Sequence, residues 1–316
     1  MAAALWLICP AASWAAYPGA NGRIAYIEPQ GTSGSCNFTT ILNDEIFTIS
    51  PAGGNPTPLT DNAIPDIDPS WSADGRRLAF VRGRTFCPNG NADVWTMDAA
   101  GGHQHQVTHG PAFDFSPSFS PGGRRILMVR DGNIVIIRTD GTELERLTRH
   151  VAAGELEFSP NGRWIVFEGK PRKGRPAGIW KMRRDGTHKR LLANPARDPR
   201  GDLGSDGYES PDFSPDGSHI VFSRCFFEGH QCSTDDILMR SDGSHKRVLG
   251  PGGGFEPVFS PDGRRIAAVV QSCDVDTCTW SIVSFARSGS DVRTVTQSHG
   301  SPPLVGNPSW QPIPGS

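Results

Sequence analysis

The sequence predicts an all-β protein, a six-bladed β-propeller of four-stranded antiparallel blades whose ring is closed by pairing of the N- and C-terminal segments. Phrases such as "FSPDGSHIVFSR" recur around five turn glycines, at positions 75, 123, 162, 217 and 263. Their spacing of about 40–55 residues is typical of propeller blades. A sixth copy is split between "ANGRIAYIE" at 20–28 and "NPSWQP" at 307–312. Because the last half-copy completes the first, we expect a closed ring and not an open stack of repeats.

The composition suits many short strands joined by turns. The 316 residues include 37 glycines and 27 prolines, with 20% charged and 36% apolar residues, a mixture that disfavours long helices. The formal net charge of −2 offers no basic surplus for nucleic acid, so we expect no nucleic-acid partner. After residue 20 every apolar run is strand-sized, and we predict no transmembrane segment in the mature chain.

Each repeat predicts four strands in a fixed order. A short inner strand such as "PDFS" enters a Pro-Asp-Gly turn, in which proline fixes φ and glycine takes the position with φ > 0. A second strand alternates apolar residues, as at Ile220 and Phe222. A third strand follows in "EIFTIS", "DVWTMD", "NIVIIR", "GIWKMR" and "DILMRS", then a turn such as "DGT", and an outer strand ending in Leu-Thr or its equivalent. The turn glycines and aspartates are therefore structural residues and not an active site.

Together, the FSPDG hairpin and the pattern "(D)-I-W-x-M-x-x-D-G-T-x-x-x-x-L-T" resemble the TolB-type propeller repeat, a WD-like repeat. The resemblance covers residues 18–312. It implies a propeller whose rim and channel dock partners or ligands. Periplasmic TolB itself carries an α/β domain before its propeller. We expect no such domain in this chain, so the resemblance implies the propeller and not the Tol–Pal role.

The N-terminal segment predicts export. An apolar run from Ala2 to Cys9 is followed by Ser13 and Ala15, placed like the −3 and −1 positions of a signal-peptidase site. No Lys or Arg precedes the run, and a buried first strand or a membrane anchor is the alternative interpretation. We predict a signal peptide over 1–16, a mature chain from about residue 16, and a single propeller domain over 17–316. The expected location is periplasmic or extracellular.

The cysteines agree with an oxidising compartment. Apart from Cys9, six remain, an even number. Two pairs are close in sequence and suit local disulfides, and the other two would then pair by elimination. A zinc site is the alternative, but CxxC spacing is absent. The predicted disulfide cysteines are Cys36 with Cys87, Cys225 with Cys232, and Cys273 with Cys278.

The strand order places the long, irregular segments on one face. In an up-and-down blade, the loop between the second and third strands opens on the same face as the link to the next blade, opposite the Asp-Gly turns. Long loops on a rigid scaffold usually carry function. The segments concerned are the cysteine loops, the basic loop "GKPRKGRPA" at 169–177 and the link at 194–210.

The residues just before each inner strand should ring the mouth of the central channel. In register they are Asp68, Ser116, Glu155, Ser210, Glu256 and Asn307, with Asp66, Asp114, Glu157, Glu209 and Asp212 nearby. Several negative charges close together in a low-dielectric channel mouth favour the binding of a cation. It could be a divalent cation such as calcium at Asp68 and Glu256, or a basic loop of a protein partner. The alternative is that these side chains only bond backbone amides of the adjacent blade. The predicted ligand- or partner-binding residues are Asp66, Asp68, Asp114, Glu155, Glu209, Glu256 and Asn307.

Catalytic motifs are absent, and no catalytic residue is predicted. There is no GxSxG, HExxH or P-loop pattern. His103, His105 and His109 fall on an outer strand at the blade edge, far from the channel. We therefore predict an exported, non-catalytic binding or scaffold propeller, with no cofactor beyond the cation just named. Its partner would be an envelope or secreted protein, or a small ligand. The alternative is a metal-dependent carbohydrate lyase or hydrolase using the same face.

Overall fold

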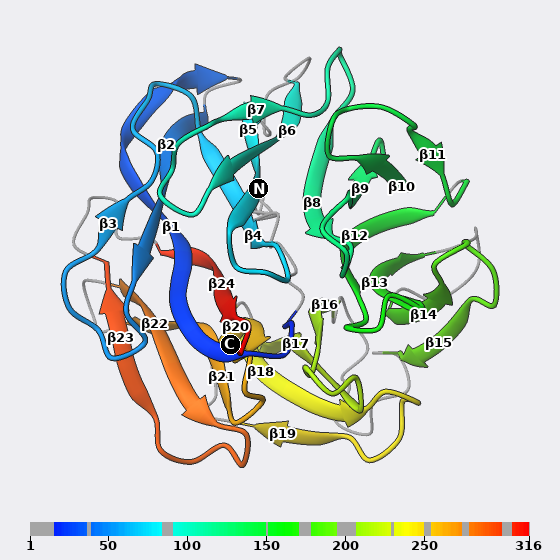
Figure 1. Cartoon of the computed structure of the whole chain (residues 1–316). Helices are drawn as coiled ribbons and strands as arrows, with labels where there is room; N and C mark the ends of the chain where they lie inside the picture. Colours follow the sequence, from blue (N-terminus) through cyan, green and yellow to red (C-terminus); the bar gives the residue numbers. More distant parts are fainter. Residues whose placement is uncertain are drawn as a thin grey trace, which may run out of the picture.

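The computed structural model describes residues 16–36, 39–83, 91–149, 151–170, 178–194, 207–228, 231–249, 254–273, 278–298 and 305–315. Within these ranges the chain forms strands β1 to β24, which pair into six four-stranded sheets. The sheets stand around a common centre, and the sequence runs round the ring from blue to red (Figure 1). The predicted six-bladed propeller is confirmed.

Every blade is built of antiparallel neighbours in sequence order, except the first, which takes its inner strand from the end of the chain. From the inner to the outer strand, blade one contains β24 (Gly306–Ile313), β1 (Ala20–Cys36), β2 (Thr39–Ile49) and β3 (Thr57–Pro58); blade two contains β4 (Asp66–Trp71), β5 (Arg77–Gly83), β6 (Ala92–Asp98) and β7 (His105–Gln106); and blade three contains β8 (Asp114–Phe119), β9 (Arg125–Arg130), β10 (Asn133–Arg138) and β11 (Glu145–Arg146).

The remaining three blades repeat this order without interruption. Blade four contains β12 (Ala152–Phe158), β13 (Trp164–Lys170), β14 (Ile179–Arg183) and β15 (Arg190–Ala193); blade five contains β16 (Gly207–Phe213), β17 (His219–Glu228), β18 (Gln231–Arg240) and β19 (Arg247–Leu249); and blade six contains β20 (Gly254–Phe259), β21 (Arg265–Cys273), β22 (Cys278–Ala286) and β23 (Arg293–Gln297). Among the described residues, no helix is long and apolar enough to cross a membrane.

The two ends of the described chain close the ring. Strand β24 pairs with β1, with Trp310 opposite Ile24, and the two lie side by side in Figure 1. The closing strand also reaches blade two, because the Gln311 side chain donates to the Gly75 carbonyl over 2.8 Å. Gly75 has φ of 65°, and a Cβ there would collide with the Pro312 carbonyl oxygen. The predicted ring closure is therefore confirmed.

One aromatic residue of each inner strand, at its last position in every blade but the first, packs the blades together. All six are at most 2% exposed, and each packs against apolar residues of the preceding blade; Trp71, for example, lies against Ala25 and Ile46 of blade one. Aromatic side chains bury about 150–250 Å² each, so this belt is a large apolar contribution to the contacts between blades. Its members are Trp71, Phe119, Phe158, Phe213, Phe259 and Trp310.

The turn chemistry follows the repeated sequence. In blade two, the Ser72 hydroxyl donates to Asp74 over 2.6 Å and accepts the Arg77 N–H over 3.0 Å. The five turn glycines have φ between 64° and 69°, as the sequence predicts. The threonine that ends the outer strand is structural as well: Thr148 Oγ1 accepts the buried Ile134 N–H over 2.8 Å.

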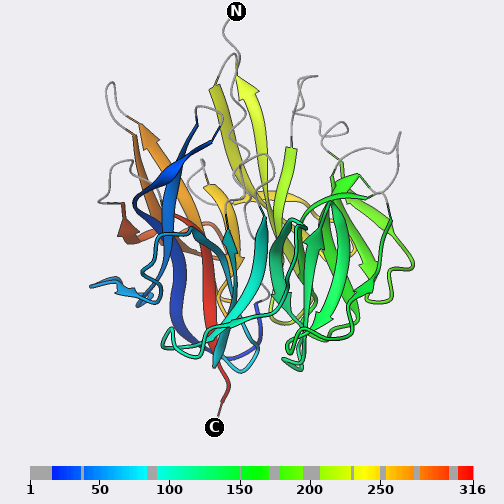
Figure 2. The same ribbon diagram turned by 90° about the horizontal axis from the view of Figure 1, so that it is seen from above.

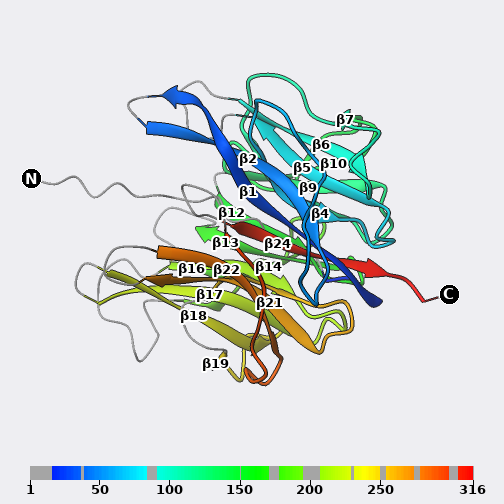
Figure 3. The same cartoon turned by 90° about the vertical axis from the view of Figure 1, so that its left-hand side faces the viewer.

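The two faces of the ring differ in length and shape. The long hairpins β1–β2, β17–β18 and β21–β22 extend on one face, and the Asp-Gly turns and the end of β24 lie on the other (Figures 2 and 3). We call these the hairpin face and the turn face. The predicted basic loop at 169–177 and the link at 194–210 lie largely outside the described residues.

Candidate functional site

Each inner strand is bent where it approaches the hairpin face. The antiparallel register shifts there in every blade, between Ile67 and Ser70 in blade two for example. At this bulge five blades carry a non-glycine residue with φ of 50–54° directly before a proline, an uncommon conformation that bulges accommodate. In blade four Leu156 replaces the proline. The positions involved, which we call the mouth ring, are Asp68, Ser116, Glu155, Ser210, Glu256 and Asn307.

Mouth-ring side chains connect consecutive blades. Asp68 Oδ2 accepts the N–H of Ser116 over 3.0 Å, and Glu256 Oε2 accepts the N–H of Asn307 over 2.6 Å. In blade four, where Leu156 stands in place of the proline, the Leu156 N–H donates to the Ser116 hydroxyl over 3.3 Å. The residues that the sequence places around the channel are thus brought together. Asp68 and Glu256 do bond backbone amides of the next blade, as the alternative interpretation predicts, and binding by the same residues stays a prediction.

Two of the predicted site residues are held by arginines. Asp66 receives both Nε and Nη2 of Arg82 over 2.6 and 2.7 Å. Asp114 receives the same two atoms of Arg130 over 2.6 and 2.5 Å. In each pair the carboxylate is fully buried and the arginine side chain is about 15% exposed. Each carboxylate therefore has an arginine counter-ion, although burial outweighs Arg82 and still raises the pKa of Asp66. We call the Asp66–Arg82 and Asp114–Arg130 pairs the struts of blades two and three.

A second group of carboxylates has no such compensation. Four glutamates from blades four, five and six lie close enough together that the charges of the other three raise the pKa of the Glu155 carboxyl group. None of them makes an ion pair with a described residue. Glu155 and Glu256 are buried, and Glu168 and Glu209 are half-buried. We call Glu155, Glu168, Glu209 and Glu256 the acidic channel cluster.

Burial dominates the electrostatics of this cluster. It raises the pKa of Glu155 well above its usual range, and the charges of the other three members raise it further. Burial and the neighbouring Glu209 raise the pKa of Glu168 to about 8. Burial, with help from Asp68 and Glu209, raises the pKa of Glu256 to about 8 against the opposing Asn307 hydrogen bond. Burial therefore disfavours the ionised form of these carboxyl groups.

Two further buried carboxylates also have raised pKa values. Burial raises the pKa of Asp68 to about 7 in spite of its hydrogen bond from Ser116, and among the described residues its Oδ1 has no hydrogen-bond partner. Burial and the adjacent Asp235 raise the pKa of Asp236 to about 8. Asp236 lies against Gly254, where a Cβ would collide with its carboxylate. Sequence reasoning missed Asp236 and Glu168 because both belong to strands outside the mouth register.

No metal centre is evident in the described part of the chain. There, no three histidine, cysteine or carboxylate residues come together as a metal-binding group. His103 is 92% exposed and bonds Asp98 over 2.7 Å, and His105 and His109 are also exposed. The predicted surface position of these histidines is confirmed, and the lyase or hydrolase alternative gains no residue cluster among the described residues.

The described cysteines lie at the ends of the long hairpins. Cys225 is disulfide-bonded and lies on β17, which pairs with the strand that contains Cys232. Cys273 and Cys278 stand directly opposite each other in the β21–β22 register. The predicted pairings within each hairpin stay predictions. The third predicted pair includes Cys87, which lies outside the described residues.

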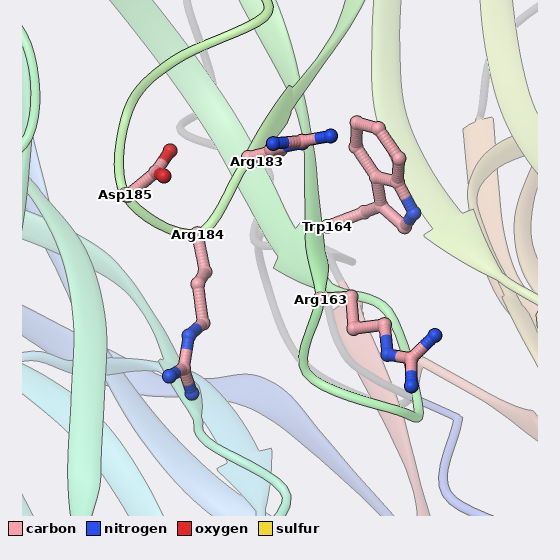
Figure 4. A pocket seen from close by; sticks show the side chains of 5 residues that line it. All are labelled: Arg163, Trp164, Arg183, Arg184 and Asp185. Carbon is pink, nitrogen blue, oxygen red and sulfur yellow. The ribbon is translucent and has the colours of Figure 1, made fainter.

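A shallow hollow on the turn face was not predicted from the sequence. It encloses about 360 Å³ between two turns of blade four. The Arg183 guanidinium lies beside the Trp164 ring (Figure 4), with its carbon 6.0 Å from the ring centroid. Three arginines and one carboxylate give the hollow a basic lining, and the signal for it was the arginine-rich pair of turns "NGRW" and "RRDG". Its lining residues are Arg163, Trp164, Arg183, Arg184 and Asp185.

With the geometry described, comparison with known proteins decides the family. The family model described as the TolB beta propeller domain matches residues 12–202. This chain belongs to the TolB β-propeller family. The Tol-Pal system protein TolB of Xanthomonas campestris pv. campestris is 36% identical over 59 residues, which are 19% of this chain and 12% of that protein. The match thus spans about an eighth of the curated relative's length.

Solved structures of TolB proteins share the fold. TolB from Acinetobacter baumannii superposes with a TM-score of 0.68 at 18% identity, covering 92% of this chain and 67% of that one. A putative TolB from Agrobacterium tumefaciens gives a TM-score of 0.62 at 18% identity, covering 89% of this chain and 90% of the other. At these identities the likeness shows the propeller architecture alone.

Proposed function

We propose that this TolB-like propeller is an exported, non-catalytic binding protein, and that its hairpin face takes up a cationic group of a protein partner at the acidic channel cluster. One observation carries the proposal: four neighbouring glutamates, two half-buried and two buried, have no compensating cation among the described residues. A buried carboxylate is costly to ionise unless a counter-charge is supplied. A lysine or arginine side chain of a partner would supply that charge.

The surroundings of the cluster support a protein partner. The long hairpins rise on the hairpin face (Figure 2), which is the face where the inner strands that carry the mouth ring begin. A partner segment held between them would meet half-buried Glu168 and Glu209 first and then the buried Glu155 and Glu256. Electrostatic complementarity of this kind gives specificity and fast association. A divalent cation such as calcium at Asp68 and Glu256, or a small cationic ligand, is the competing occupant.

Export is part of the proposal, and the family resemblance to periplasmic TolB supports it together with the signal-peptide pattern and the disulfide-bonded Cys225. The relative's name places it in the Tol-Pal system, but the match is too short to carry that role to this chain. Fractionation of cells that produce the full chain tests export. A mature form in the periplasm or medium supports it, and an unprocessed cytoplasmic protein overturns it.

A ligand-stabilisation experiment tests the channel. The purified protein is melted in EDTA, then with calcium, magnesium, manganese or zinc, and separately with tetralysine or tetraglutamate at low salt. A ligand present at about a hundred times its Kd stabilises the native state by about 2.7 kcal/mol. We expect tetralysine, and not tetraglutamate, to raise the melting temperature.

Three variants decide between the occupants. Glu168→Gln combined with Glu209→Gln should abolish the tetralysine shift, and Asp140→Asn, which changes an exposed turn carboxylate, should leave it intact. A shift with a divalent metal alone, lost in Asp68→Asn with Glu256→Gln, would replace the basic partner with a cation site. No shift with any probe would overturn binding in the channel.

A further inference from the structure

The first described residues of the chain lie inside the propeller. Gly19 donates its N–H to the Pro261 carbonyl in the turn of blade six over 3.2 Å. From there the chain runs toward the centre of the ring (Figure 1). Tyr17 is 2% exposed and its hydroxyl donates to the Phe119 carbonyl of blade three. Ala16 is 3% exposed and packs in the apolar cluster that includes Phe259. Ala16 and Tyr17 are therefore buried inside the ring, whereas Pro18 is exposed and Gly19 is half-buried.

The nitrogen of Ala16 meets a buried carboxylate. It lies 3.3 Å from Asp212 Oδ1, and the other oxygen of Asp212 accepts the Phe259 N–H over 2.7 Å. Glu157 of the adjacent blade is also fully buried, and its Oε2 has no hydrogen-bond partner in the part of the chain that the structure describes. Among the described residues neither Asp212 nor Glu157 makes an ion pair. Burial raises the pKa of both groups well above their usual range.

Cleavage at the predicted signal-peptidase site would release this same nitrogen as the new N-terminus. With Ser13 and Ala15 at the −3 and −1 positions, the hydrolysed bond is Ala15–Ala16. Addition of water breaks the amide, leaves the carboxyl group on Ala15 and gives Ala16 an α-amine. That amine takes up a proton at neutral pH, because its ordinary pKa is about 7.7–8.0. One neutral N–H donor thereby becomes a positively charged group with three donors.

We propose that cleavage after Ala15 turns the Ala16 α-ammonium into the buried counter-ion of Asp212, with Glu157 beside it, so that removal of the leader completes the core of the propeller. The inference rests on the export proposed above. The geometry supports it because the nitrogen is already within hydrogen-bond distance of Asp212, and the small methyl group of alanine fits the packed cluster around Phe259. A buried ion pair with good geometry stabilises its carboxylate, whereas loss of one partner is strongly destabilising.

A double-mutant cycle on the mature chain tests the pair. Protein that starts at Ala16 is released from an N-terminal fusion and is compared with the same chain carrying an acetylated α-amine, at pH 7. We expect acetylation to reduce the folded-to-unfolded ratio about a hundredfold, since it leaves a buried carboxylate unpaired. In the Asp212→Asn background the reduction should be less than about threefold. Asp216→Asn, which changes a turn aspartate, should retain the full effect.

Chemical reactivity gives a second measurement that needs no variant. The Ala16 amine of the folded wild-type chain should react with an acylating reagent at least about tenfold more slowly than in urea, because a buried, paired ammonium is protected. Equal rates in the two states, or an acetylation effect that is the same with Asp212→Asn, would overturn the pair. Both experiments use purified mature chain, so they give the same answer whether or not the cell exports it. N-terminal sequencing of exported protein tests the cleavage site separately.

Discussion

The backbone N–H of Asn307 donates to Glu256 Oε2 over 2.6 Å, so the closing strand of the ring is fastened to blade six through a buried carboxyl group. Burial and the neighbouring Asp68 and Glu209 raise the pKa of that group to about 8. The same side chain thus serves the fold as a link between blades and belongs to the acidic channel cluster.

We expect the unfolding free energy to fall as the pH rises from about 5 to 8. The folded state keeps a proton on Glu256 that the unfolded chain releases near the ordinary pKa of about 4.3. The stability linked to that proton is fully present below the unfolded pKa and is lost as the pH rises through about 8. Asp68, Glu168 and Asp236 add to the trend. Urea unfolding at several pH values checks it, and a stability maximum at pH 8 would contradict it.

Replacement of Glu256 by glutamine should flatten this decline. The amide cannot ionise and still accepts the Asn307 N–H. We therefore expect Glu256→Gln to raise the unfolding free energy by about 1–3 kcal/mol at pH 8 and to change it little at pH 5. Paired urea titrations of wild type and variant measure the difference. Equal stabilisation at both pH values would mean that packing, and not ionisation, causes the gain.

In the struts of blades two and three, removal of a charged side chain should lower the unfolding free energy, in contrast to Glu256→Gln. Arg82→Met leaves Asp66 buried without its counter-ion, and Arg82 also lies over the Phe80 and Trp95 rings. We expect a loss of about 3–5 kcal/mol at pH 7, shrinking toward pH 4 as Asp66 takes up a proton. Arg138→Met, which removes surface ion pairs, should cost less than about 1 kcal/mol. Similar losses in the two variants would show that Asp66 does not depend on Arg82.

Ring closure can be tested at a single glycine. Gly75→Ala places a methyl group against the Pro312 carbonyl, at a position where φ is 65°. We expect a loss of more than about 1–2 kcal/mol, with faster unfolding measured by tryptophan fluorescence. Gly122→Ala is the matched control, because nothing lies within 4 Å of a Cβ there. A neutral Gly75→Ala would place the closing strand elsewhere.

Local chemistry explains why much of the fold was predictable. A turn such as the one at Ser72–Arg77 depends on residues five positions apart, so its sequence repeats wherever its geometry repeats. The mouth ring followed from the same register. The struts could have been found too: Asp66 and Arg82, like Asp114 and Arg130, are 16 residues apart in successive copies.

The rest depends on contacts between distant parts of the chain. Ala16 meets Asp212 across 196 residues and Tyr17 meets Phe119 across 102, and no repeat pattern encodes either contact. The pKa of Glu168 depends in part on another blade, because the charge of Glu209 in blade five adds to the effect of burial. Sequence reasoning could place acidic residues near the channel, but it could not tell which of them an arginine neutralises and which stay uncompensated.

The central claim is that the carboxyl groups of the acidic channel cluster stay protonated until a cationic group of a partner supplies the positive counter-charge that lets them ionise. Carbon NMR of the glutamate carboxyl groups, with resonances assigned through the Glu168→Gln and Glu256→Gln variants, measures it directly in the mature protein. We predict pKa values near 8 for Glu168 and Glu256 without a probe, and a fall toward the ordinary range when tetralysine is added. Ordinary values without a probe, or raised values that tetralysine leaves unchanged, would contradict the account.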